Sequence, residues 1–271
     1  MKSIRSLRLA PGKAAVLQKE LVARVTSHVL PVYLVAEYPK SGGTWLKFML
    51  AEAIGVPAWT KGNPVRGSNV MQAHWIKPKG GCRSVALFRD GRDVMVSYYF
   101  HSFFRNEFRN QSLVAFMRNH FKFTDFEDIQ SNLPRFIEEM ATRPISPVFS
   151  WGEFVRAWYD RPGVVACRYE DLRKDPSKTL QRLIDELSIT PLGTERACQI
   201  ADRYTMEKMK AQKDSLDPGN RNRGLVEKSF TRKGIVGGWT EYFTEDALQV
   251  FEYFFAEEMK ILDYPLGRPQ T

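Results

Sequence analysis

The chain has 271 residues, of which 43% are hydrophobic and 26% charged, a composition typical of one globular α/β domain or two small ones. Its formal net charge is +9, which favours an anionic ligand, nucleic acid or an acidic membrane surface. The basic residues are dispersed among acidic ones, and this disfavours a dedicated nucleic-acid-binding tail, so we expect no nucleic-acid partner. No apolar run approaches the ~20 residues that span a bilayer, and we expect no stable membrane insertion.

Cysteine and histidine usage indicates neither a disulfide framework nor a metal site. Cys82, Cys167 and Cys198 are widely separated, and neither they nor the four histidines show metal-ligand spacing. We therefore expect reduced thiols, a cytoplasmic location and no metal. The first thirty residues are basic and nearly free of acids, as in a transit peptide, but they lack an apolar signal-peptide core. An amphipathic N-terminal helix is the preferred interpretation.

Hydrophobic patterning predicts strands that alternate with helices along the chain. Strands are expected at 32–37, 71–74, 84–88 and 164–169. Helices are expected over 11–29 and 44–54, from Val94, through most of 98–143, and over 151–159, 176–187 and 245–260. The polar stretch 213–233 is expected to be a long mobile loop. This order predicts a three-layer P-loop-like α/β fold, with a central parallel sheet flanked by helices.

The segment Tyr38-Pro39-Lys40-Ser41-Gly42-Gly43-Thr44-Trp45 joins the first predicted strand to a helix. A strand, a glycine loop and a helix together gather backbone N–H groups around an anion, and a lysine adds a mobile positive charge. In the Walker loop of NTP-cleaving proteins the lysine follows the glycines, whereas Lys40 precedes them. Taken alone, the segment is equally consistent with a simple glycine turn that carries a solvated lysine.

The next predicted strand ends at Arg89, in the segment 89–99. Ligands of open parallel sheets bind at the carboxyl ends of the strands, so Arg89 is a candidate phosphate contact. Ser97 is expected one helical turn into the following helix, where it can also contact a phosphate. The alternative is an Arg–Asp salt-bridge cluster that caps the helix.

Two later segments carry similar candidates. Tyr169, in the segment 168–172, ends the fourth predicted strand and could stack on a base or fill the core. Arg232 and Lys233 are adjacent and precede Gly234, which makes either a compact clamp for a phosphate dianion or a solvated surface turn.

Together these four segments resemble the sulfotransferase family that uses 3′-phosphoadenosine 5′-phosphosulfate (PAPS). The family's loop reads YPKSGTTW against YPKSGGTW here, and its signature R-x-x-x-D-V-x-V-S-Y-Y matches residues 89–99. The motifs YEDL and RKG-x-x-G-x-W recur in the family's order, so the resemblance covers roughly residues 32–260. It implies transfer of a sulfuryl group to an acceptor hydroxyl or amine. We accordingly assign 1–31 to an N-terminal helical extension, 32–262 to a sulfotransferase domain and 263–271 to a C-terminal tail.

The resemblance implies a role for each matching residue. The 5′-phosphosulfate would be cradled by Lys40, Ser41, Gly42, Gly43, Thr44 and Trp45, with Trp45 also flanking the adenine. The 3′-phosphate would be held by Arg89, Ser97, Arg232, Lys233 and Gly234. The adenine would be fixed by Tyr169 with the segment Thr205–Met206.

His74 follows a predicted strand, as the family's catalytic histidine does, and is the candidate general base. Lys40 would neutralise charge on the bridging oxygen as the nucleotide leaves, without a metal. Without the resemblance, a histidine beside Trp75 would be read as a packing residue.

Several positions depart from the family's pattern. The family often has a lysine two residues before the histidine, where this chain has Gln72. Gly43 replaces a threonine and Gly238 replaces the usual aspartate. The dimer motif of the animal cytosolic members is not reproduced after Trp239, so the sequence leaves the oligomeric state open.

Two other functions and several acceptors remain open from sequence. A nucleotide kinase or P-loop NTPase would need Mg²⁺ ligands and a Gly-Lys-Ser/Thr loop. A non-catalytic nucleotide- or RNA-binding module would fit the positive charge and Gln72. The aromatic segment 98–126 could wall an apolar pocket for a phenol, a lipid or another small hydroxylated metabolite, or it could be core. The basic surface leaves room for an anionic glycan.

Overall fold

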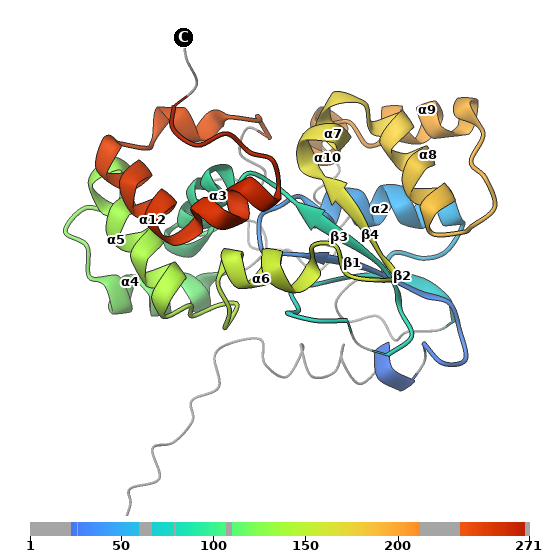
Figure 1. The fold of residues 1–271 in the computed structure, drawn as a ribbon, viewed down its shortest axis with the longest axis horizontal. Coiled ribbons are helices and arrows are strands. Elements are labelled where there is room, and N and C mark those ends of the chain that lie inside the picture. Colours follow the sequence, from blue (N-terminus) through green and yellow to red (C-terminus); the bar gives the residue numbers. More distant parts are fainter. Residues whose placement is uncertain are drawn as a thin grey trace, which may run out of the picture.

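The computed structural model describes residues 23–25, 27–59, 67–78, 80–106, 110–211 and 234–268 (Figure 1). Its strands are β1 (Val32–Glu37), β2 (Asn69–Ala73), β3 (Arg83–Phe88) and β4 (Val164–Arg168). Its helices are α2 (Gly43–Ile54), α3 (Gly91–Phe103), α4 (Gln111–Phe121), α5 (Ile129–Thr142), α6 (Trp151–Trp158), α7 (Tyr169–Lys174), α8 (Pro176–Glu186), α9 (Thr194–Arg203), α10 (Met206–Ala211), the 3₁₀ helix η2 (Gly238–Glu241) and α12 (Glu245–Ile261).

The four strands form one parallel sheet in the order β2-β1-β3-β4. Strand β1 lies between β2 and β3, so the chain moves to one side of β1 and then to the other. This reversal is the switch point at which open α/β sheets bind their ligands. The predicted fold class, a central parallel sheet flanked by helices, is confirmed.

The sheet is apolar on both faces because helices cover both. Along β1, Val32, Leu34 and Ala36 belong to one buried cluster, and Tyr33 and Val35 belong to another. Successive side chains of a strand point to opposite faces, which explains the alternation. Continuous apolar runs are typical of parallel strands buried on both sides.

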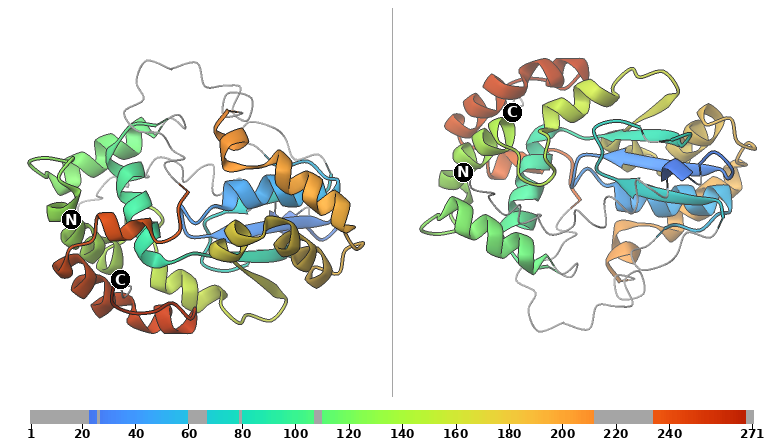
Figure 2. Two further views of the ribbon diagram at one scale, coloured as in Figure 1. Left: turned by 90° about the horizontal axis from the view of Figure 1, so that it is seen from above. Right: turned by 90° about the horizontal axis from the view of Figure 1, so that it is seen from below.

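Figure 2 shows two helical groups, one that runs alongside the sheet and one that lies mainly beyond the carboxyl ends of its strands. Helix α2 packs on β1 and β2, and α7 and α8 pack on β4. The second group comprises α3, α4, α5, α6 and α12, in which α12 packs closely on α5. In this group Trp158 of α6 donates its indole N–H to the main-chain oxygen of Trp75, at 2.6 Å.

The sequence did not decide whether the aromatic segment 98–126 lines a pocket or fills the core. In the structure this segment is largely core. The rings of Tyr99 and Phe103 have centroids 4.6 Å apart, and Phe103 also contacts Phe121 and Phe136. All four side chains are buried. Phe100 is only partly buried at the margin of the same cluster.

Two element boundaries differ from the prediction. Helix α3 begins at Gly91 and not near Val94, because the Asp90 carboxylate caps it by accepting the Arg92 N–H at 2.9 Å. The short helix α7 directly follows β4, where sequence predicted a connection only. The predicted loop at 213–233 and most of the predicted N-terminal helix lie outside the described residues.

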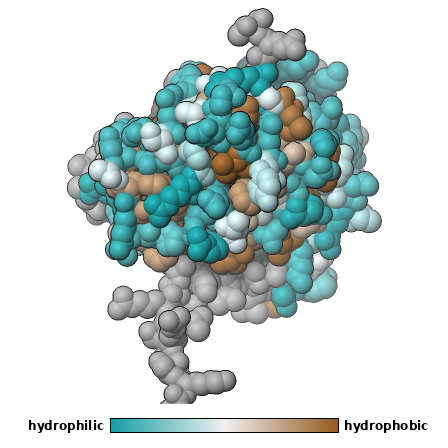
Figure 3. Space-filling model, turned by 60° about the vertical axis from the view of Figure 1, so that its left-hand side comes forward, coloured by the Kyte–Doolittle hydropathy of each residue, from teal (hydrophilic) through white to brown (hydrophobic). Residues whose placement is uncertain are grey.

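Large apolar side chains at the surface are scattered, as with Phe116 on α4 and Tyr253 on α12. The face formed by α5 and α12 is mainly hydrophilic, with small apolar patches (Figure 3). None of the helices in the described part of the chain combines the length and apolar character needed to cross a membrane.

Candidate active site

The carboxyl ends of the four strands bring the predicted site segments to one edge of the sheet. The register pairs Ala36 of β1 with Ala73 of β2, and Phe88 of β3 with Arg168 of β4. The segments that begin at residues 38, 74, 89 and 169 therefore leave the sheet at the same edge. This is where the strand-order reversal predicts a ligand site.

The loop after β1 has a left-handed backbone at two positions. Lys40 has φ 77° and Gly42 has φ 105°. At Gly42 a Cβ atom would also lie 2.7 Å from the Tyr169 ring, so this position needs glycine for both reasons. Gly42 has no side chain with which to cap α2, and the first turn of α2 carries no acidic residue. The helix dipole therefore favours an anion at this end.

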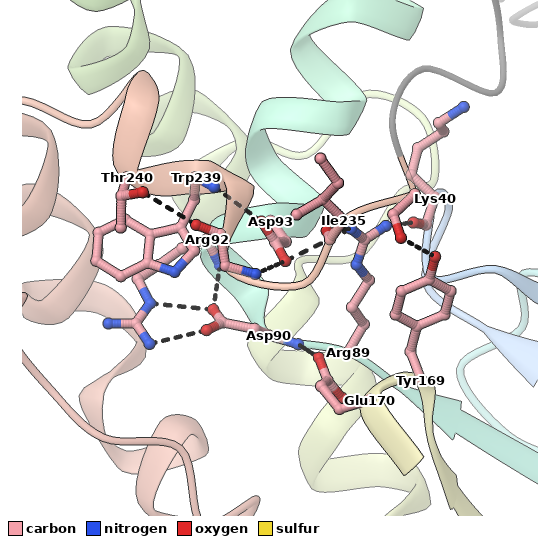
Figure 4. Close-up of polar contacts among 12 residues, drawn as sticks. Lys40, Arg89, Asp90, Arg92, Asp93, Tyr169, Glu170, Ile235, Trp239 and Thr240 are labelled. Atoms are coloured by element: carbon pink, nitrogen blue, oxygen red, sulfur yellow. Dashed lines mark hydrogen bonds and ion pairs between the residues drawn. The ribbon is translucent and has the colours of Figure 1, made fainter. Parts of the chain in front are cut away.

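Arg89 connects this loop to the segment that follows residue 233 (Figure 4). Its Nη1 donates to the main-chain oxygen of Lys40 at 3.2 Å, and its Nη2 donates to that of Ile235 at 3.1 Å. The guanidinium also lies 3.5 Å from the Asp93 carboxylate and 4.3 Å from the centre of the Tyr169 ring. Arg89 is buried, and its Nε has no hydrogen-bond partner among the described residues.

Asp93 fixes the segment 234–239 on the first turn of α3. Its two carboxylate oxygens accept the N–H groups of Gly237 and Trp239, each at 2.9 Å. Burial raises the pKa of Asp93, whereas Arg89 and the two N–H groups lower it. Asp93 matches the aspartate of the family signature, but the sequence alone predicted no role for it.

The predicted adenine contacts also lie together. The rings of Trp45 and Tyr169 meet edge to face at 6.1 Å, and Trp45 donates its indole N–H to the main-chain oxygen of Tyr204 at 2.7 Å. Tyr204 directly precedes Thr205, which places the predicted segment 205–206 beside Trp45. Burial raises the pKa of Tyr169, so its hydroxyl is a neutral donor, and it donates to the main-chain oxygen of Gly234 at 3.1 Å.

Of the three remaining predicted site residues, the structure describes one. Arg232 and Lys233 lie outside the described residues. Ser97 lies in the second turn of α3, somewhat further from the helix start than predicted, because α3 begins three residues earlier. Its side chain is half-buried.

His74 follows β2 immediately and is exposed. Its Nδ1 lies 3.1 Å from the main-chain oxygen of Glu37. A carbonyl oxygen only accepts hydrogen bonds, so Nδ1 carries the hydrogen, and in the neutral imidazole Nε2 is then the acceptor nitrogen. This tautomer suits a general base that acts through Nε2.

Glu37 is a buried carboxyl group that sequence reasoning missed. One oxygen accepts the Gly43 N–H at 2.5 Å, and the other accepts from Gln72 Nε2 at 2.5 Å. Burial raises the pKa of Glu37 to about 7, although these hydrogen bonds and the charges of Lys40 and Lys47 lower it. The available signal was an acidic residue at the end of an apolar strand.

Comparison with known proteins agrees with this geometry. Residues 69–263 match the family model described as the sulfotransferase domain. The match covers more than half of the chain, which therefore belongs to the sulfotransferase family of enzymes.

Among relatives, mouse sulfotransferase 2A6 is 25% identical over 276 residues, which cover 92% of this chain and 92% of the mouse protein. Human sulfotransferase 1E1 is 28% identical over 184 residues, which cover 66% of this chain and 55% of the human protein. Several relatives thus share about half of their length with this chain.

Solved structures share the fold. The mouse sulfotransferase SULT7A1, complexed with PAP, has a TM-score of 0.64 at 20% identity, with 92% of this chain and 91% of that chain covered. Retinol dehydratase, in complex with androsterone and the inactive cofactor PAP, has a TM-score of 0.62 at 19% identity, with coverages of 94% and 88%.

Proposed function

We propose that this chain transfers the sulfuryl group of PAPS to a hydroxyl or amine of an acceptor. The observation that carries the proposal is the convergence of the Lys40 loop, Arg89, Tyr169 and Gly234 at the switch point of the sheet. Two buried polar atoms at this site, Arg89 Nε and Ser41 Oγ, have no hydrogen-bond partner among the described residues. Unsatisfied buried polar groups are rare, and these two fit a phosphate-bearing ligand.

The residues present fit such a nucleotide. Lys40 through Trp45 would hold the 5′ end at the N-terminus of α2, and Arg89, Ser97 and Gly234, with Arg232 and Lys233, would hold the 3′-phosphate. Trp45 and Tyr169 would flank the base, together with Thr205 and Met206. When bound, PAPS supplies an activated sulfuryl group on its 5′-phosphate.

The chain's own residues supply the proton transfer and the charge compensation. His74 Nε2 would take the proton from the acceptor hydroxyl, with Nδ1 anchored to the Glu37 carbonyl. The Lys40 ammonium compensates the charge that develops on the bridging oxygen. No step in this scheme uses a metal.

We propose a small apolar acceptor. The relatives include a guinea pig 3-alpha-hydroxysteroid sulfotransferase, 24% identical over 251 residues, and a rabbit amine sulfotransferase, 25% identical over 204 residues. Both support a small molecule that carries a hydroxyl or an amine. The free thiols of Cys82, Cys167 and Cys198 support a reducing, cytoplasmic location.

Nucleotide binding tests the donor assignment. Adenosine 3′,5′-bisphosphate (PAP) without Mg²⁺ should raise the melting temperature, whereas ATP with Mg²⁺ should not. The reverse pattern would support a P-loop NTPase and contradict the proposal. Labelled PAPS screened against phenols, sterols, amines and sugars then tests transfer, because a non-catalytic nucleotide-binding module would label none of them.

A further inference from the structure

Two departures from the family's motifs, Gly43 and Gln72, meet at the Glu37 carboxyl group beneath the donor loop. Glu37 ends β1, Gly43 begins α2 and Gln72 lies on β2. Their side-chain and main-chain atoms are joined through the Glu37 carboxyl group, with both hydrogen bonds at 2.5 Å. Gln72 Oε1 in turn accepts from the Thr44 hydroxyl at 3.1 Å. The chain of hydrogen bonds therefore begins and ends in the donor loop.

Gly43 is required for this arrangement. A Cβ atom at Gly43 would lie 2.6 Å from Glu37 Oε1 and 2.8 Å from Oε2, closer than real Cβ contacts. The threonine of the family's pattern cannot occupy this position while Glu37 holds its place. The absence of a side chain at Gly43 therefore leaves the space that the buried Glu37 carboxyl group fills.

With Gln72 at this position, the carboxyl group has no cation in direct contact among the described residues. At this position the family often has a lysine, whose ammonium would form an ion pair with Glu37. The neutral amide supplies one hydrogen bond and no charge. Among the described residues, the charged and titratable groups that face Glu37 are Lys40, Lys47 and the imidazole of His74, which contacts the Glu37 main-chain oxygen.

An anionic nucleotide would bring at least one further negative charge to this loop. Coulomb repulsion between two negative charges at short range in a buried site amounts to several kcal/mol at an effective dielectric near 20. Glu37 is 2% exposed, so water screens this repulsion poorly. Protonation of the carboxyl group removes it, and the pKa of about 7 places that protonation near neutral pH.

We propose that Glu37 is a positioning residue of the donor loop that takes up one proton when the donor nucleotide binds. This inference rests on the proposed function, because it needs a phosphate-bearing nucleotide at the Lys40 loop. The proton comes from solvent, resides on a Glu37 carboxyl oxygen while the nucleotide is bound, and returns to solvent on release. Donor affinity is thereby coupled to pH through a residue that does not contact the reacting atoms.

Titration calorimetry with PAP tests the coupling on the full-length protein. Above about pH 7, wild-type affinity should fall by up to about tenfold per pH unit, as expected for uptake of one proton. Glu37→Gln keeps an oxygen for the Gly43 N–H and should remove this dependence. The phosphates of PAP titrate near pH 6 in every variant, so the difference between variants isolates Glu37. Glu139→Gln on α5, which removes another buried carboxyl group, should behave as wild type.

A second measurement covers the case in which Glu37→Gln does not fold. Calorimetry at about pH 8 in two buffers of different ionisation enthalpy should show net uptake approaching one proton by the wild type. His74→Gln should retain that uptake, which separates Glu37 from the imidazole. Equal pH dependence in wild type and Glu37→Gln, or no uptake in the two buffers, overturns the role of Glu37 alone. Absence of PAP binding at any pH overturns this inference and the proposed function together.

Discussion

The Arg89 guanidinium donates to the main-chain oxygen of Lys40 across 3.2 Å, so a side chain at the end of β3 holds the turn that follows β1. The same guanidinium donates to Ile235, nearly 150 residues later in the chain. The buried Arg89 side chain thus joins three segments that the sequence predicts to bind the same nucleotide. The position of Arg89 therefore sets the geometry of the proposed donor site.

Arg89→Lys should weaken PAP binding by about tenfold to a hundredfold. Lysine keeps the positive charge but cannot donate to two carbonyl oxygens at fixed geometry, and hydrogen bonds to charged groups contribute about 1.5–3 kcal/mol. Isothermal titration calorimetry measures the change. Arg143→Lys on α5 is the control, because the Arg143 side chain is 77% exposed in its ion pair. Unchanged PAP affinity in Arg89→Lys would remove Arg89 from the donor site.

Gly43→Ala should destabilise the fold by about 1–3 kcal/mol, because the added methyl group overlaps the Glu37 carboxyl group. Urea unfolding measures the effect. The loss of stability caused by Gly43→Ala should be smaller in a Glu37→Ala background, because the added methyl group then no longer overlaps a carboxyl group. Gly193→Ala at the start of α9 is the control, because no atom lies within 4 Å of its added Cβ. Additive effects of Gly43→Ala and Glu37→Ala would show that the two residues do not interact.

Glu37 should make the free energy of unfolding depend on pH in the absence of ligand. Its pKa is raised from 4.5 to about 7 in the folded state, so the folded state binds the proton more tightly than the unfolded state. The stabilising contribution of Glu37 to the free energy of unfolding is complete below about pH 4.5 and is lost as pH rises to about 7. The pKa difference corresponds to roughly 3 kcal/mol.

Glu37→Gln should therefore gain stability relative to wild type as pH rises from about 4.5 to about 7. Guanidinium unfolding at a series of pH values measures this difference. A difference between wild type and Glu37→Gln that is constant with pH would mean that Glu37 titrates normally in the folded protein.

Much of the fold was predictable because its signals are local. The apolar run 32–37 and the glycine loop after it define β1 and the start of α2 without tertiary information. The convergence of Arg89 and Tyr169 followed from a general property of parallel sheets, whose strands end at one edge. Family motifs then supplied roles that spacing alone left open.

The parts that sequence missed depend on contacts between distant residues. Glu37 is separated from Gln72 by 35 positions, so their hydrogen bond has no local signature. The role of Asp93 requires residues 237 and 239 to lie over α3. The start of α3 was misplaced because the cap at Asp90 competes with an equally plausible strand-end salt bridge.

Replacement of His74 tests the proposed sulfuryl transfer most directly. The measurement is the rate of label transfer from PAPS to the best acceptor in the screen, with PAP affinity measured in parallel and His120→Ala on α4 as the control. His74→Ala should lose about 10²- to 10⁴-fold in transfer rate while PAP affinity stays close to wild type. Wild-type transfer by His74→Ala would contradict the account.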